Sequence, residues 1–414
     1  MIQETDILAL DANDPLQHVR SQFHLPENLI YLDGNSLGAM PLSSRARVAE
    51  VTNQQWGEHL ITSWNRHQWV QLPRQVGDKI AKLVGAKVGQ VICTDSISVN
   101  LFKVLAAAFS LLRHTERREI ISTKDNFPTD LYMVEGLAAL LQNEGIKLTL
   151  VDEAELEAHI SEHTLAVLFT QVNFRTGRRL NVANITAQAH QHGALSIVDL
   201  AHSAGVMPVE LDNWQVDFAV GCTYKYMNAG PGAPAFVYVA ERHLAHISQP
   251  LSGWFGHAQP FAFEPHFTPA TGIEKMLTGT PSVISMAAVD AALNVFAELD
   301  MQAIRKKSMA MGQLFADLMQ QTGLTEAMTL QSPTDAEQRG SQLSYAHPDA
   351  YAICQALIAR DVVADFRAPN LLRVGFAPLY NSYLDVWRAV QTLQHIFQSK
   401  EYLQPQFQAR AQVT

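Results

Sequence analysis

The feature that most constrains this chain is an alternation of short apolar runs with helical patterns, which begins near residue 88. The apolar runs predict strands, and the segments between them carry the spacing of amphipathic helices. Strands that alternate with helices imply right-handed crossovers and a mainly parallel sheet. Because the runs are nearly continuous, we expect both faces of the sheet to be covered. The predicted strands are 88–94, 118–124, 146–152, 164–172, 194–202, 216–226 and 233–240.

The rest of the chain has a different pattern. Residues 282–323 are mostly helical with a break near Asp300, and strands mixed with helices follow to the end of the chain. A chain of 414 residues exceeds the usual limit for one core. We therefore expect an α/β fold with a large domain over 56–280 and a smaller α+β domain over 281–414, which residues 1–55 join. The helices predicted between the strands are 100–112, 131–145, 154–163 and 184–193.

Charge and cysteine content exclude several classes of function. The formal net charge is −10 and no Lys/Arg-rich run occurs, which argues against nucleic acid or a membrane as partner. The longest apolar stretch, 104–112, is too short to span a bilayer. The three Cys residues are far apart in the sequence, so we expect no metal site and a reducing compartment. With no signal-peptide pattern at the start, the sequence predicts a cytoplasmic protein.

Two short motifs have simpler explanations than the functions that they suggest. Residues 34–38, GNSLG, match the nucleophile elbow of hydrolases, but only one candidate strand precedes them and Pro41 interrupts any helix that would follow. A tight turn after a strand explains them better. His243 and His246 share a helix face, but no third ligand accompanies them, so we read them as a surface pair.

The informative block is 196–232, where polar side chains follow two buried strands. Asp199 ends one apolar strand and His202 comes three residues later, while Tyr224 and Lys225 end the next strand before a Gly-Pro-Gly turn. In open parallel sheets, ligands bind beyond the carboxyl ends of the strands. Each residue alone would be read as a satisfied or solvated side chain. Together they place an acid, an imidazole, a phenol and an amine around one crevice.

Pyridoxal phosphate is a cofactor that joins such groups. Its aldehyde condenses with a lysine amine such as that of Lys225. Its pyridine nitrogen must stay protonated, which a fixed carboxylate such as Asp199 favours. Its phosphate needs backbone N–H groups and hydroxyls at a helix N-terminus, and segment 94–100, TDSISVN, provides both between a strand and a helix. Without a cofactor, Ser98 would be read as a helix cap.

Longer motifs extend this reading to a family. The segments DLAHSAG and TYKYMNAGPG resemble the class V branch of fold-type I pyridoxal-phosphate enzymes, and more narrowly the kynureninase family. Other segments agree with that resemblance from residue 31 to residue 382: YLDGNSLG, TDSISVNLFK, NFPTD, FTQVNFRTG, SGWFGH, GTPSVISM and LLRVGFAPLYNS. The resemblance implies the fold-type I architecture, with a mainly parallel sheet flanked by helices and a smaller domain built from both termini.

The resemblance also implies a set of cofactor-binding residues. Lys225 would bind the cofactor and later move the substrate α-proton, Asp199 would pair with the pyridine nitrogen, and Tyr224 would reach the phosphate and shuttle a proton. These three would be catalytic. Phe127 would stack on the ring, where many class V relatives carry a His. The full set is Ile97, Ser98, Phe127, Pro128, Thr129, Asp130, Thr170, Asp199, His202, Tyr224, Lys225, Trp254 and Thr280.

Substrate contacts and a second subunit follow from the same resemblance. Trp254 and Thr280 would reach the phosphate from the partner subunit, so a homodimer with a shared site is expected. Arg373 would form a bidentate pair with the substrate α-carboxylate, a geometry that Lys cannot copy. Trp64 and Asn35 are candidates for the aromatic end of the substrate and for local ordering.

The implied reaction is hydrolytic Cβ–Cγ cleavage of L-kynurenine or 3-hydroxykynurenine to an anthranilate and L-alanine, in tryptophan catabolism or NAD biosynthesis. One alternative is another class V enzyme such as a cysteine desulfurase, which needs a Cys nucleophile on a mobile loop. Cys93, Cys222 and Cys354 lie in or near regular elements and do not suit that role. The other alternative is a non-catalytic pyridoxal-phosphate-binding protein, which the presence of Lys225 and Asp199 disfavours.

Overall fold

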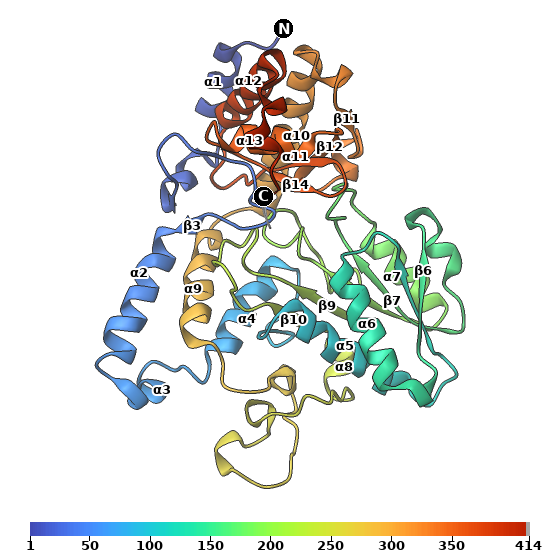
Figure 1. Ribbon diagram of the computed structural model, residues 1–414. Helices are drawn as coiled ribbons and strands as arrows, with labels where there is room; N and C mark the ends of the chain where they lie inside the picture. Colours follow the sequence, from blue (N-terminus) through green and yellow to red (C-terminus); the bar gives the residue numbers. More distant parts are fainter. Residues whose placement is uncertain (411–414) are drawn as a thin grey trace.

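The computed structural model describes residues 1–410 and confirms the predicted α/β fold. A seven-stranded sheet runs through the larger part of the molecule in the order β4-β10-β9-β8-β7-β5-β6 (Figure 1). The neighbours from β9 to β6 pair in parallel, whereas β10 is antiparallel to both β4 and β9. The strands are β4 Val91–Cys93, β5 Glu119–Thr123, β6 Lys147–Val151, β7 Thr164–Thr170, β8 Leu195–Asp199, β9 Phe218–Gly221 and β10 Phe236–Val239.

Both faces of this sheet are buried from β4 to β5, as the continuous apolar runs predict, whereas the edge strand β6 is mostly exposed or half-buried. In β4, Val91 and Cys93 pack into one apolar core while Ile92 packs into another, because successive side chains of a strand point to opposite faces. In β8, Val198 and Ile197 divide in the same way. The helices of this part are α4 Leu72–Leu83, α5 Ile97–Leu112, α6 Pro128–Leu140, α7 Val182–Gln191, α8 Glu241–Leu244 and α9 Val283–Leu293.

One predicted helix is wrong. Residues 154–163 form two separate 3-10 turns, Glu153–Glu155 and Glu157–His159, instead of one α-helix. Only Leu156 and Ile160 of the segment are buried hydrophobic residues. Because the first turn of a helix is costly to form, a short segment with two anchoring side chains gains too little from packing to stay helical.

The smaller part of the molecule is built around a four-stranded antiparallel sheet. Its order is β11-β12-β15-β14, and helices from both ends of the chain pack in one core with it. These strands are β11 Thr329–Leu330, β12 Gln342–Ala346, β14 Asp365–Arg367 and β15 Leu371–Gly375. The helices are α1 Glu4–Ala12, α10 Met301–Gln321, α11 Ala350–Ile358, α12 Tyr383–Ser399 and α13 Pro405–Gln408. The break predicted near Asp300 is confirmed, since Asp300 caps α10.

Segments from the two ends of the chain meet in this smaller part. Strand β2 Ile30–Tyr31 pairs in parallel with β13 Val362–Val363, and Ile7 lies in the same core as residues of α12. The boundaries 1–55, 56–280 and 281–414 stay predictions, and residues 411–414 lie outside the described part of the chain.

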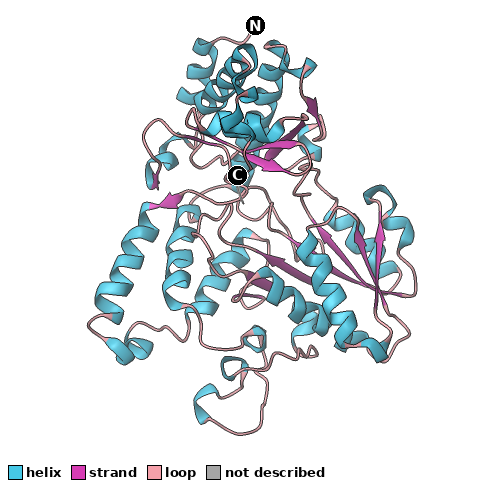
Figure 2. Cartoon of the chain, in the orientation of Figure 1, coloured by secondary structure: helices cyan, strands magenta, loops and turns pink. Residues whose placement is uncertain are grey.

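Other segments connect and extend the two parts. The remaining elements are β1 Phe23–His24, β3 Met40–Pro41, α2 Leu42–Glu50 and α3 Ser63–Arg66. The segment between α8 and α9 is mostly loop with short helical turns, and it projects from the larger part (Figure 2). Among residues 1–410, no helix is both long and apolar enough to cross a membrane.

Candidate active site

The centre of the large sheet brings the predicted acid and amine to one cavity. Asp199 is the last residue of β8, and Lys225 follows the neighbouring strand β9. Both line a cavity of about 620 Å³ at the carboxyl ends of these strands. The sheet order explains the meeting, since the carboxyl ends of adjacent parallel strands lie at the same edge.

Most of the other predicted residues line the same cavity. Besides Asp199 and Lys225, these are Ile97, Ser98, Phe127, Thr129, Asp130, Thr170, His202, Tyr224 and Thr280. Thr280 thus lines the cavity of its own chain, although the family resemblance predicts that it reaches the cofactor site of the partner subunit. The residues that do not line the cavity are Pro128, Trp254, Arg373, Trp64 and Asn35.

The two predicted tryptophans lie in an aromatic cluster away from the cavity lining. The Trp64 ring centroid is 5.6 Å from that of Trp69 and 5.9 Å from that of Phe255. Trp254 packs edge-on against Phe255 at 4.5 Å and remains 36% exposed. Trp254 belongs to the loop segment between α8 and α9, so its place beside a cofactor stays a prediction.

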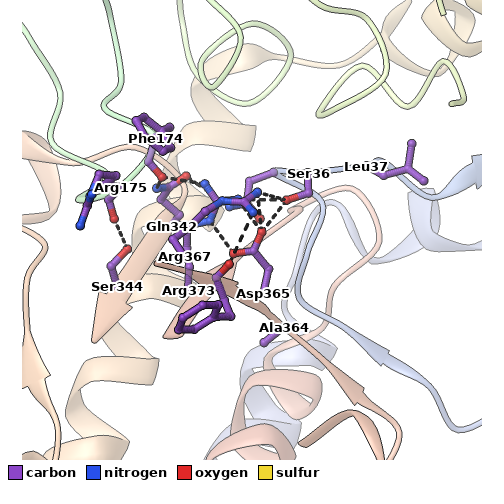
Figure 3. A network of polar contacts seen from close by, with 12 residues as sticks. Ser36, Leu37, Phe174, Arg175, Gln342, Ser344, Ala364, Asp365, Arg367 and Arg373 are labelled. Atoms are coloured by element: carbon purple, nitrogen blue, oxygen red, sulfur yellow. Dashed lines mark hydrogen bonds and ion pairs between the residues drawn. The ribbon is translucent and has the colours of Figure 1, made fainter. Parts of the chain in front are cut away.

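Arg373 lies in a buried polar network next to the cavity (Figure 3), and Asn35 is buried beside it. The Arg373 guanidinium already binds Asp365 through two hydrogen bonds, from Nε at 3.1 Å and from Nη2 at 2.7 Å. Asn35 lies beside Gln342 in the same network, with an amide-to-amide distance of 3.3 Å. The bidentate contact predicted for Arg373 is therefore made to a carboxylate of the chain itself in this structure.

The Lys225 amine is hydrogen-bonded to an imidazole. Nζ of Lys225 lies 3.0 Å from Nε2 of His202. Burial, with Lys225 as the next cause, lowers the pKa of His202 well below its usual value. The ring is therefore neutral and accepts the Lys225 proton at Nε2, which leaves its other nitrogen, Nδ1, as a donor. That Nδ1 is buried and makes no hydrogen bond of ordinary geometry among the described residues, although the Gln342 side chain lies close enough to the ring to act on its pKa.

Two carboxyl groups of the cavity are short of partners. Asp199 accepts one hydrogen bond, from the Ala201 N–H at 2.7 Å. Burial raises its pKa to about 6, although Lys225 acts in the opposite direction. Asp130 is fully buried, and neither of its oxygens makes a hydrogen bond of ordinary geometry among the described residues, although the nearby Asn126 side chain acts to lower its pKa. Burial and the nearby Asp199 raise the pKa of Asp130 well above its usual value.

The amino end of α5 forms another wall of the cavity. The side chain of Ser96 caps the helix by accepting from Val99 N, and Ser96, Ile97 and Ser98 all line the cavity. The preceding residue, Asp95, has a left-handed φ of 48°. Its carboxylate is held by the fully buried amine of Lys103, which also donates to the Met276 carbonyl. Lys103 therefore fixes this end of the helix.

The GNSLG turn positions the backbone around Lys225. The Gly38 N–H donates to the Tyr224 carbonyl at 2.8 Å. A Cβ at Gly38 would lie 2.3 Å from the Lys225 carbonyl oxygen, so no larger residue fits there. The reading of this motif as a tight turn agrees with these contacts, and the requirement for glycine comes from the approach to Lys225.

The sequence reasoning missed one aromatic residue of the cavity. Phe174 lines it and packs edge-on against Phe127, with ring centroids 5.3 Å apart. Nζ of Lys225 lies 6.0 Å from the Phe127 ring centroid, so the amine and this aromatic pair face the same space. A signal was present, because Phe174 follows directly on β7 in the motif FTQVNFRTG, at the strand edge where ligands bind.

The residues present fit pyridoxal phosphate. Buried polar atoms without partners are rare, so the free Nδ1 of His202 and the free oxygens of Asp130 indicate a ligand with polar ring atoms. A helix N-terminus with Ser98 suits a phosphate. The Lys225 amine suits an aldehyde, and Asp199 suits a protonated ring nitrogen. Within residues 1–410, no group of three or more His, Cys, Asp or Glu side chains is arranged to hold a metal ion.

Comparisons with known proteins agree on one family. The kynureninase C-terminal domain family matches residues 304–393. A kynureninase from Pseudomonas fluorescens is 48% identical over 417 residues, which cover 100% of both chains. A kynureninase from Burkholderia pseudomallei (strain 1106a) is 48% identical over 415 residues, which cover 99% of both chains.

Solved structures with the same fold have much lower identity. The cysteine desulfurase from Thermococcus onnurineus superposes with a TM-score of 0.76 at 19% identity, over 92% of this chain and 98% of that one. A cysteine desulfurase from Escherichia coli gives 0.77 at 20% identity, over 93% and 98%. A C-DES variant with glycine covalently linked to its PLP cofactor gives 0.77 at 19%, over 91% and 98%. These likenesses establish the fold alone.

The fold, and a cavity with a lysine and an aspartate at adjacent strand ends, define a pyridoxal-phosphate enzyme of fold type I. The 48% identity to two kynureninases over the full length of the chain narrows that class to one family. The chain belongs to the kynureninase family, and it is a pyridoxal-phosphate-dependent hydrolase.

Proposed function

We propose that this protein cleaves the Cβ–Cγ bond of L-kynurenine, 3-hydroxykynurenine or both by hydrolysis. Water is consumed, an anthranilate leaves, and the three-carbon fragment is released as L-alanine. One observation carries the proposal: Lys225 and Asp199 line one cavity whose buried polar atoms lack partners, in a chain that is 48% identical to kynureninases over its full length.

The lining residues divide the work of holding the cofactor. Lys225 would bind its aldehyde, Asp199 its ring nitrogen, and the amino end of α5 with Ser98 its phosphate. Phe127 and Phe174 would form an aromatic wall. The bound cofactor supplies an electron-withdrawing ring that stabilises negative charge at the substrate α-carbon. Because the Asp199 pKa is only about 6, its carboxylate is ionised near neutral pH and favours a positive charge opposite it.

Proton movement falls to Lys225, His202 and Tyr224. The Lys225 amine would take the substrate α-proton, since it lies in the cavity and shares a hydrogen bond of 3.0 Å with His202. Burial raises the pKa of Tyr224 above its usual value, so its phenol stays protonated and can donate to a carbanion or oxyanion. Phe127 contributes apolar contact and no proton.

A homodimer with a shared site completes the proposal. The segment around Trp254 exposes further aromatic side chains, namely Phe261 at 54%, Phe263 at 75% and Phe267 at 41%. Exposed apolar groups gathered on one projecting loop favour contact with a second copy of the chain. Trp254 would then reach the partner's cofactor, while the position of Thr280 also suits a contact within its own chain. Sedimentation equilibrium tests the pairing, and a monomer mass would refute it.

The cysteines disfavour the desulfurase alternative. Cys93, Cys222 and Cys354 are all buried, and burial raises the pKa of each thiol. A thiol with a raised pKa is a poor nucleophile at neutral pH. Each also lies in or beside a regular element, away from the mobile loop that this chemistry requires.

A spectroscopic titration tests the proposed function. Cofactor-loaded protein is mixed with L-kynurenine, and in parallel with 3-hydroxykynurenine, while visible absorbance and anthranilate fluorescence are recorded. We expect one equivalent of L-alanine for each anthranilate, and loss of turnover by about a thousandfold or more in Lys225→Ala. Cofactor absorbance without product would favour a non-catalytic binding protein, and sulfide release from cysteine would favour a desulfurase.

A further inference from the structure

The guanidinium of Arg373 is almost enclosed by groups of the chain itself (Figure 3). Its side chain is 1% exposed. Nε donates to Asp365 Oδ1 at 3.1 Å, and Nη2 donates to Asp365 Oδ2 at 2.7 Å. Nη2 also donates to Ser36 Oγ at 2.9 Å, and Nη1 donates to the Phe174 carbonyl at 2.6 Å. The side-chain amide of Asn35 lies 3.0 Å from Nε.

These contacts occupy the two edges of the guanidinium differently. The side edge, formed by Nε and Nη2, binds a carboxylate in the bidentate way. The end edge, formed by Nη1 and Nη2, meets a hydroxyl and a backbone carbonyl, from Ser36 and Phe174, and the same Ser36 hydroxyl donates to Asp365 Oδ2 at 2.9 Å. A second carboxylate therefore has an edge to bind without displacing Asp365.

The strengths of the contacts at the two edges also favour exchange at the end edge. Ser36 and the Phe174 carbonyl are neutral acceptors, and an ionised carboxylate that replaces them makes stronger hydrogen bonds with the guanidinium. Breaking the buried ion pair with Asp365 costs far more, because it leaves an uncompensated buried charge. Both Asp365 and Arg373 are 1% exposed, so the incoming carboxylate replaces Ser36 and Phe174, and Asp365 stays bound.

Phe174 separates this end edge from the cavity. Its ring lines the cavity beside Phe127, while its carbonyl accepts from Arg373 and from Gln342 Nε2 at 3.0 Å. The neighbouring Arg175 carbonyl is held by Ser344 Oγ. Access of a ligand carboxylate to the end edge of Arg373 therefore requires this backbone segment to move.

The charge around Asp365 favours a second anion. Arg367 Nη2 also binds Asp365, at 2.7 Å, so one carboxylate serves two guanidinium groups. Asp33 is the other acid of the network, and burial together with Asp365 raises its pKa to about 7. At or below neutral pH, the network thus keeps a positive excess.

We infer that Asp365 is a positioning residue that fixes the side edge of Arg373, while Ser36 and the Phe174 carbonyl are exchangeable occupants of the end edge that the substrate carboxylate takes. This inference rests on the proposed function. It assigns to Asp365, which is absent from the cavity lining, control over carboxylate recognition inside the cavity.

The test compares two ligands that differ only in the carboxylate. Cofactor-loaded protein is titrated with L-alanine and with L-alaninamide, and the dissociation constants are read from visible absorbance. In Asp365→Asn, we expect the preference for L-alanine to fall by about tenfold or more, because a charged hydrogen-bonded contact loses its geometry. KM should rise by about as much, while kcat changes by less than about threefold.

Two variants separate this role from general damage. Asp385→Asn removes a buried acid of the same part, which binds Arg20 and caps α12, and should keep the ligand preference. Ser36→Ala removes an exchangeable occupant, and should weaken L-alanine binding by less than about threefold. This variant tests the idea even if Asp365→Asn does not fold.

Three results would overturn the inference. One is an equal loss of affinity for both ligands in Asp365→Asn, and another is an unchanged preference in that variant. The third is a tenfold loss in Ser36→Ala. Failure of the proposed function would be distinct, since the wild-type protein would then release no anthranilate whatever its preference between the two ligands.

Discussion

Two buried aspartates lie at opposite ends of adjacent strands in the seven-stranded sheet, and they differ in the number of hydrogen bonds that they accept. Asp217 directly precedes β9, and Asp199 ends the adjacent strand β8. Asp217 accepts hydrogen bonds from four residues within 3.1 Å: Ser196, His190, Arg242 and His243. Asp199 accepts one, from Ala201.

This difference in hydrogen bonding shifts the pKa values of the two carboxyl groups in opposite directions. Burial alone would raise the pKa of Asp217, but hydrogen bonds from His190 and His243 outweigh it, and the pKa is lowered. Burial of Asp199 has no such compensation, and its pKa rises to about 6. The Asp217 carboxylate is therefore fully hydrogen-bonded and stabilises the fold. The Asp199 carboxylate keeps unused hydrogen-bonding capacity for a ligand.

Removing the charge at the cavity end should have the largest effect. In Asp199→Asn, we expect turnover to fall by about a hundredfold, the scale for losing one electrostatic stabilising group. The cofactor-free protein should lose no stability and should become more stable at neutral pH, because the substitution removes a buried carboxylate whose pKa is raised and which accepts only one backbone hydrogen bond. Steady-state kinetics and urea unfolding measure the two quantities. A large loss of stability would contradict the contrast between the two ends.

The same substitution at the saturated end should act on stability. In Asp217→Asn, we expect a loss of about 2 kcal/mol, below the usual value for a broken buried pair because Arg242 is 40% exposed. Turnover per folded molecule should stay unchanged. Glu241→Gln, which breaks the exposed pair with Lys87, is the control and should leave the free energy of unfolding nearly unchanged. Equal losses of unfolding free energy in both variants would show that the hydrogen bonds of Asp217 add no more stability than an exposed ion pair.

The pH dependence should be the most gradual effect. Asp199 and Asp33, with pKa values raised to about 6 and about 7, bind protons more tightly in the folded chain than in the unfolded one. The stability of the cofactor-free protein should therefore fall as pH rises from about 4 to about 7, by at most about 1.4 kcal/mol per pH unit for each group. Unfolding midpoints across that range measure it. Asp199→Asn should flatten the slope between about 4 and 6.

Much of the fold and part of the site could be predicted from the sequence. The apolar runs locate β4 to β10 because a strand covered on both faces needs such residues. Asp199 and Lys225 could be placed together because adjacent parallel strands end at one edge. The orientation of Arg373 could not be predicted, since Asp365, which fixes its side edge, and Ser36, which meets its end edge, come from segments remote from each other in the sequence. Phe174 was missed because a single aromatic residue in a loop carries no periodic signal.

The strand pairing also governs when the molecule can take shape. Strand β4 pairs with β10 alone, and β2 pairs with β13. Strands near the start of the chain therefore cannot pair until segments much later in the sequence have been synthesised. A nascent chain that has emerged only as far as β9 still lacks the strand that joins Val91–Cys93 to the sheet. A fragment that stops before Val362 would leave Ile30 and Tyr31 without a partner strand. We therefore expect long-lived partly folded chains on the ribosome, with apolar surface that chaperones would recognise.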